Sequence, residues 1–191
     1  MKSLVVLASC LLLGAAASPA AVITYVTNMS GPNESPPTTS PGNGSAVVIV
    51  DTALNLLSVS FNFADLTTGT TAAHIHCCTA LPETGTANVA TAVPFFPGFP
   101  IGVTSGTYNM TFNMMMDSTW NPAFITSSGG TAAMAEATFL AGLADGETYL
   151  NVHTTTDPGG EIRGFLELAP EPGTWLLAGA ALILLGMRRR R

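Results

Sequence analysis

Strict alternation of apolar and polar side chains is the feature that most limits the fold of this chain. From Leu54 to Leu66 the sequence reads LNLLSVSFNFADL, in which every second residue from Leu57 to Phe63 is apolar and the residues between are polar. Other short runs alternate or are rich in β-branched residues, among them SAVVIV, SGTYNMTFNM and YLNVHT. Strands with one apolar face must bury that face against a second layer, so the pattern predicts an antiparallel β-sandwich.

Turn signals separate these runs. VDTALN between two apolar runs predicts a hairpin, and TTDPGG predicts a turn between ETYLNVHT and EIRGFLEL. Three prolines make VPFFPGFP a loop with buried aromatic rings. The single helical candidate runs from Thr131 to Gly146, because it is rich in Ala, Leu and Met and ends before Asp-Gly. We therefore expect a mainly β fold with one short helix.

Both ends of the chain look like processing signals that form terminal helices. Residues 1–21 have a positive start, an apolar stretch and small residues for cleavage, as secretory signal peptides do. Residues 169–191 contain Pro170, Glu171 and Pro172, then an apolar run from Trp175 to Met187 and four arginines. This order resembles the PEP-CTERM sorting signal of Gram-negative bacteria. A GPI signal is the rival interpretation, and the closing arginines argue against it because a GPI tail ends in its hydrophobic run.

The PEP-CTERM resemblance implies a location and a partner. It implies recognition by an exosortase-type processing enzyme, transient anchoring in the inner membrane, and delivery to the cell surface or exopolysaccharide matrix. The membrane would then be contacted only through the terminal segments, by a short transmembrane helix at the C-terminal end.

Charge is distributed unevenly between the ends and the middle. Residues 22–168 hold eleven Asp and Glu but only Arg163 among Lys and Arg, which gives a formal net charge near −10. Nucleic acids and anionic lipid surfaces are therefore excluded as partners, because both require clustered cations.

Three short motifs occur in order along residues 22–168: AHIH (residues 73–76), YLNVHT (149–154) and GGEIRGFL (159–166), with NESPP (33–37) before them. Together they resemble the CHRD domain, the module first recognised in chordin and also found in exported bacterial proteins. The resemblance implies an immunoglobulin-like or superoxide-dismutase-like antiparallel sandwich. It brings no settled biochemical activity, and the sequence contains no nucleophile with a base and an orienting group at recognisable spacing.

The three histidines of the chain are candidate metal ligands. On a strand His74 and His76 share one face, and His153 would join them if the two strands were neighbours. Three imidazoles with an open position suit zinc or copper, and Cys78 on the same face is a weaker fourth candidate. The alternative is that these histidines only form structural hydrogen bonds, in which case no cofactor is needed.

Cys77 and Cys78 have three alternative fates. They form a vicinal disulfide, remain thiols, or pair between chains, and an oxidising compartment favours the vicinal disulfide. A disulfide would remove Cys78 from the metal ligands. Farther along, Glu161 and Arg163 are two residues apart in GEIRG, which predicts a structural ion pair between them on one strand face.

Two functions follow from these observations. The first is a surface-associated CHRD module, structural or adhesive, that contacts matrix or polysaccharide and has no enzymatic activity. The second is a metalloprotein with His74, His76 and His153 as ligands of copper or zinc, with dismutase-like chemistry as one form of it.

Overall fold

A single antiparallel sheet, folded over on itself, forms the framework of the protein. The computed structural model describes residues 21–170. The strands are hydrogen-bonded in the order β4-β6-β7-β1-β2-β3-β5, and β8 pairs with β1. Their bounds are Val22–Ser30 (β1), Asn43–Asp51 (β2), Leu56–Ala64 (β3), Thr70–His76 (β4), Gly106–Asn113 (β5), Tyr149–Thr154 (β6), Ile162–Phe165 (β7) and Glu167–Leu168 (β8).

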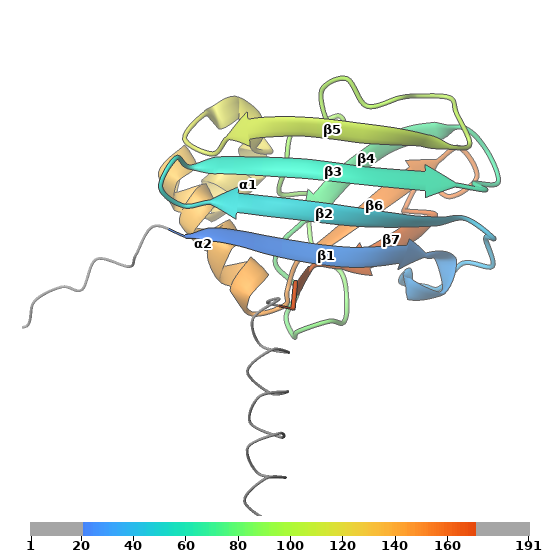
Figure 1. The fold of residues 1–191 in the computed structure, drawn as a ribbon, viewed down its shortest axis with the longest axis horizontal. Helices are drawn as coiled ribbons and strands as arrows, with labels where there is room; N and C mark the ends of the chain where they lie inside the picture. The colour runs from blue at the N-terminus through green and yellow to red at the C-terminus, as the bar shows by residue number, and fades with distance from the viewer. Residues whose placement is uncertain (1–20, 171–191) are drawn as a thin grey trace, which may run out of the picture.

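The sheet folds at β1, so that two layers face each other. Strands β1, β2, β3 and β5 lie in front in Figure 1, while β4, β6 and β7 cross behind them. β1 pairs with β2 along its whole length but meets β7 only where Ser30 lies opposite Arg163. The prediction of a mainly β, antiparallel, sandwich-like fold is therefore confirmed.

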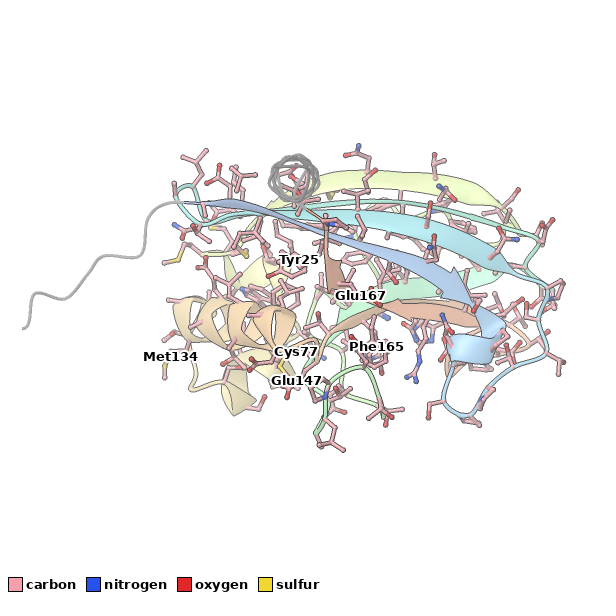
Figure 2. The ribbon with its side chains drawn as sticks, turned by 60° about the horizontal axis from the view of Figure 1, so that its bottom comes forward. Tyr25, Cys77, Met134, Glu147, Phe165 and Glu167 are labelled. Carbon is pink, nitrogen blue, oxygen red and sulfur yellow. A yellow bond between two sulfur atoms is a disulfide. The ribbon has the colours of Figure 1, made fainter. Side chains whose placement is uncertain are left out.

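The apolar faces of the two layers form the core. Leu57, Val59, Phe61 and Phe63, the alternating residues of β3, are all buried, which confirms the face assigned to them. The opposite layer contributes the buried residues Ala73, Ile75, Leu150 and Val152. Figure 2 shows Tyr25 between the layers. Phe96 and Phe99 of the proline-rich loop pack on this core, as the sequence predicted.

Within residues 21–170, two α-helices rather than the expected one cover an end of the sandwich. Helix α2 (Ala132–Ala144) is the predicted helix, with the Thr131 side chain accepting a hydrogen bond from the Met134 amide as its N-cap. Helix α1 (Pro122–Ser127) was not predicted, although Asn121 caps it and Pro122 occupies its first turn. Two short 3₁₀ turns, η1 (Gly31–Asn33) and η2 (Asp117–Thr119), complete the elements. The expectation of one helix was wrong because α1 is too short to show helical periodicity.

The terminal signals fall largely outside the described residues. Residues 1–20 and 171–191 are not described, so the predicted signal helices, Glu171, Pro172 and the apolar run from Trp175 to Met187 are not described either. Within residues 21–170 no helix is long and apolar enough to cross a bilayer.

Candidate metal centre

The three histidines meet on the outer face of the layer formed by β4, β6 and β7. β4 and β6 are antiparallel neighbours, with His74 opposite Asn151 and His76 opposite Tyr149. Alternation places Ile75 and Val152 in the core and turns His74, His76 and His153 to the other side, where loops bury them. One nitrogen atom from each ring lies within 4.8 Å of one from each of the other two.

Each imidazole ring is anchored by a backbone carbonyl. His74 Nε2 lies 2.8 Å from the oxygen of Pro94, His76 Nδ1 lies 2.8 Å from that of Ala87, and His153 Nδ1 lies 2.9 Å from that of Pro158. A carbonyl oxygen only accepts hydrogen bonds, so each of these nitrogens carries the proton. In the neutral rings, His74 Nδ1, His76 Nε2 and His153 Nε2 are therefore left with bare lone pairs.

No hydrogen-bond donor among the described residues faces these lone pairs. His74 Nδ1 and His153 Nε2 face each other at 3.2 Å, and a hydrogen bond between them would require one ring to carry an extra proton. His76 Nε2 is buried without a hydrogen-bond partner among residues 21–170. Burying polar atoms without hydrogen-bond partners costs free energy of folding. Three acceptors turned toward one another therefore favour the binding of a cation between them.

Protonation of the rings does not supply this positive charge, because the pKa of each histidine is lowered. Burial, reinforced by the His153 ring, lowers the pKa of His74 to about 4. Burial also lowers the pKa of His76 to about 4, although the Ala87 carbonyl acts in the opposite direction. Burial likewise lowers the pKa of His153, against the effect of its hydrogen bond to Pro158. At neutral pH the three rings are uncharged, which is the form that coordinates metal ions.

The separation of His74 Nδ1 and His153 Nε2 suits a transition-metal ion. Zinc–nitrogen bonds of roughly 2.0–2.1 Å in a tetrahedron place two ligand nitrogens about 3.3 Å apart, close to the separation of His74 Nδ1 and His153 Nε2. The carbonyl anchors have the role that outer-shell partners have in metalloproteins, where they fix the tautomer and orientation of each ligand.

Aromatic stacking holds His76 in place. The Tyr149 ring lies parallel to the His76 ring, with centroids 4.7 Å apart and an interplanar angle of 9°. The guanidinium of Arg163 lies over the Tyr149 ring, 4.7 Å from its centroid. The Tyr149 hydroxyl donates to the same Ala87 carbonyl oxygen that anchors His76. His76 is thus fixed both in its plane and at its edge.

Arg163 pairs with a different carboxylate from the one predicted. Its Nε lies 3.8 Å from Glu34 Oε2, and it also donates hydrogen bonds to the carbonyl oxygens of Asn33 and Gly85. Burial raises the pKa of Glu34 to about 7, although the charge of Arg163 acts to lower it. The expected Glu161–Arg163 pair does not form, because Glu161 precedes β7 and is not bound by its alternation.

Hydroxyl and amide groups bind Glu161 instead. Its Oε1 accepts hydrogen bonds from the Ser40 hydroxyl at 2.5 Å and the Thr67 amide at 2.6 Å, and its Oε2 accepts one from the Thr154 hydroxyl at 2.5 Å. Burial alone would raise the pKa of Glu161, but these hydrogen bonds together hold it below the usual value. Glu161 therefore connects the loops before β2 and β4 to β6, and it forms no ion pair with any residue of the described range 21–170.

Cys77 and Cys78 form a disulfide that packs against helix α2. Cys77 and Cys78 are bonded to each other, which is the first of the three alternatives. A methyl group on Gly142 of α2 would lie 2.5 Å from Cys78 Sγ and 2.6 Å from Cys77 Sγ, so the disulfide packs closely against that helix. Figure 2 shows Cys77 beside α2. Cys78 is therefore not available as a metal ligand, and the weaker fourth candidate is withdrawn.

Two further buried polar residues lie near the site, Asn151 beside His76 and Glu34 beside Asn151, and sequence reasoning assigned neither of them a role. Asn151 lies between His74 and Arg163 in the strand register, and its Oδ1 has no hydrogen-bond partner among the described residues. Glu34 has an equally unpartnered Oε1. Asn151 shares the face of His153 in YLNVHT, so alternation could have found it. Glu34 lies far away in the sequence, and although it belongs to the NESPP motif, strand alternation does not connect it to the histidines.

Fold and site together define a class: a small antiparallel sandwich-like module with a buried, carbonyl-anchored histidine triad on its outer face. The sequence model of the CHRD domain matches residues 25–166, and the chain therefore belongs to the CHRD domain family. This confirms the resemblance drawn from its three motifs. Membership of this family points to a binding or structural module. Searches of curated proteins and of solved structures found no match.

Proposed function

We propose that this CHRD domain binds one transition-metal ion, zinc or copper, through His74 Nδ1, His76 Nε2 and His153 Nε2. The observation that supports it is the set of three converging imidazole lone pairs, each fixed by a backbone carbonyl on the other side of its ring. Buried side-chain polar atoms in native structures mostly have hydrogen-bond partners, whereas His76 Nε2 has none among residues 21–170.

The ion would have a structural or binding role rather than a catalytic one. It would join β4 to β6 and hold the loops that provide the carbonyls of Ala87, Pro94 and Pro158. Imidazole ligands suit both zinc and copper, so the site itself does not select between them.

Isothermal titration of the purified protein with Zn²⁺ and with Cu²⁺ tests the proposal. We expect one equivalent per chain. His76→Gln and His153→Gln should each weaken binding by at least about 100-fold, because even the loss of an outer-shell partner costs roughly 10–100-fold in affinity. Asp117→Asn is the matched control, because it removes an exposed carboxylate of the acidic surface. Weak binding of several equivalents, unchanged by His76→Gln, would instead indicate surface carboxylates and contradict the site.

We further propose that the domain acts outside the cytoplasm, at the cell surface or in an exopolysaccharide matrix, as a structural or adhesive module. Support comes from the apolar start of the chain, from the Pro170–Pro172 motif followed by an apolar run and four arginines, and from the acidic charge of the domain. An exosortase-type enzyme would remove the C-terminal tail after transient anchoring in the inner membrane of a Gram-negative host.

Mass spectrometry of the native protein, recovered from fractionated cells, tests this location. We expect surface material with an intact mass that lacks both residues 1–21 and the tail after the Pro-Glu-Pro motif. Replacing Glu171 and the four terminal arginines should leave the longer, tailed form in the membrane fraction. Full-length chain in the cytoplasmic fraction would contradict export.

A further inference from the structure

Three histidine ligands leave one position of a tetrahedral ion free for a ligand that the protein does not supply. Zinc sites of this type carry water or a substrate there. Among residues 21–170 the cluster of possible ligands contains the three histidines and no Asp, Glu or Cys. The chemistry around the open position therefore decides which external ligand fits it.

Asn151 is the polar residue placed to select that ligand. It lies opposite His74 in the strand register, is 1 % exposed, and its amide lies beside His76. Asn151 Oδ1 and His76 Nε2 are both buried acceptors without a donor. A metal ion would satisfy His76 Nε2, and Asn151 Oδ1 would still lack a hydrogen-bond donor.

The orientation of the Asn151 amide is fixed from its other side. Its Nδ2 lies 3.5 Å from the carbonyl oxygen of Gly159 and faces the Glu34 carboxylate. Rotating the amide would place Oδ1 against the Gly159 carbonyl oxygen and against the Glu34 carboxylate in its ionised form, so Nδ2 stays on that side and Oδ1 stays toward the histidines. Arg163, 3.8 Å from Glu34 Oε2, holds the carboxylate in turn.

Gly160 makes room for this arrangement. A methyl group at Gly160 would lie 2.5 Å from Glu34 Oε1 and 2.6 Å from Asn151 Nδ2, so both side chains pack directly on its backbone. Gly160 has a φ of +131°, a conformation that residues with a Cβ rarely adopt. The sequence thus provides a glycine where the carboxylate and the amide converge.

We propose that the fourth position of the metal takes a water molecule, or another small ligand with an O–H or N–H group, which donates a hydrogen bond to Asn151 Oδ1. The ligand coordinates the ion through its lone pair and donates a hydrogen bond to Asn151 Oδ1, the oxygen that Glu34 and Arg163 keep turned toward it. Asn151 is a positioning residue and does not touch the ion. The inference rests on the proposed metal site. It follows that an anion without hydrogens, such as azide, is disfavoured.

Visible absorption of the Co²⁺-loaded protein tests this selection, because Co²⁺ in a zinc site changes its spectrum when an external ligand binds. We expect azide to alter the wild-type spectrum only at high concentration. Asn151→Leu should bind azide about tenfold more tightly, since water loses its acceptor and azide no longer leaves an oxygen unpaired. Asn109→Leu, an exposed asparagine on the outer face of β5, is the matched control and should leave azide affinity unchanged.

Glu34→Gln provides a second test in case Asn151→Leu fails to fold. With the carboxylate gone, the Asn151 amide can rotate and present Nδ2, which donates to azide, so azide affinity should again rise. Glu167→Gln removes an exposed carboxylate nearby and serves as its control. Equal azide affinity in the wild type and in whichever of the two variants folds would overturn the inference, as would a spectrum that azide never changes. Failure of the wild type to bind Co²⁺ would instead refute the metal site itself.

Discussion

The surroundings of His76 fix the tautomer and the orientation of its ring through both ring nitrogens and one ring face. The Ala87 carbonyl accepts the proton of Nδ1, Tyr149 covers one face of the ring, and Nε2 lies buried without a donor. Strand alternation predicted from the sequence that His76 and His74 share a face. It could not predict the tautomer, because the anchoring carbonyls belong to loop residues whose side chains carry no signal for this contact. The decisive chemistry of the site lies in the backbone.

The depressed pKa values of the histidines predict that the metal-free protein loses stability in mild acid. The unfolded rings titrate near 6.5, whereas the pKa of His74 and that of His76 are about 4 in the folded chain. Between these values the unfolded chain binds protons that the folded chain does not bind, so stability falls as pH decreases from about 6.5 to 4. His74 and His76 each contribute roughly 3 kcal/mol to this loss, because a difference of one in pKa corresponds to about 1.36 kcal/mol.

Urea unfolding in the presence of a chelator, measured from pH 7.5 to 4, checks this prediction. His76→Gln should flatten the pH dependence by the contribution of one histidine. Glu34 acts in the opposite sense, because its raised pKa makes the folded chain bind the extra proton and favours folding as pH falls toward its unfolded value. Glu34→Gln should therefore steepen the loss. Identical pH slopes in the wild type and His76→Gln would show that His76 is already protonated in the folded state.

Secondary-structure elements could be predicted from the sequence where a single pattern controls them. β3 was predicted because its buried and exposed residues alternate without a break, and α2 because Thr131 precedes a long run of helix formers. α1 was missed even though Asn121 and Pro122 form a recognisable helix start. Its six residues make less than two turns, which is too short for a periodic pattern to be seen in the sequence. Tertiary contacts such as that of Phe124 with Trp120 stabilise it instead.

Elements that come together only in the folded chain could not be predicted. The Arg163–Glu34 pair joins β7 to the segment after η1, and the sequence instead suggested Glu161, the nearer carboxylate. Glu161 lies one residue before β7, where alternation does not yet apply, and it turns toward Ser40, Thr67 and Thr154. Proximity along the chain was therefore a poor guide to pairing for this arginine, because strand register and loop packing decide which carboxylate it meets.

At the scale of the whole molecule, the histidine site links parts of the chain that are far apart in sequence. The three ligands come from two strands, and their carbonyl anchors come from the loops after β4 and after β6. The surrounding domain is acidic, with Arg163 as its single Lys or Arg between residues 22 and 168. An acidic surface raises the local concentration of cations, which favours encounter with a metal ion and disfavours nucleic acids.

Because the ion would bind only the folded arrangement of β4, β6 and their loops, metal should stabilise the entire domain. Free Zn²⁺ at 100 times its dissociation constant adds about 2.7 kcal/mol to the free energy of unfolding. For a domain of this size that corresponds to an increase in Tm of roughly 5–10 °C. Differential scanning calorimetry with Zn²⁺ and with a chelator measures the difference. His153→Gln should show one Tm under both conditions, whereas Asp117→Asn should retain the full shift. If the wild-type Tm were the same with Zn²⁺ and with chelator, the three imidazole lone pairs would not bind the ion and the metal site would be contradicted.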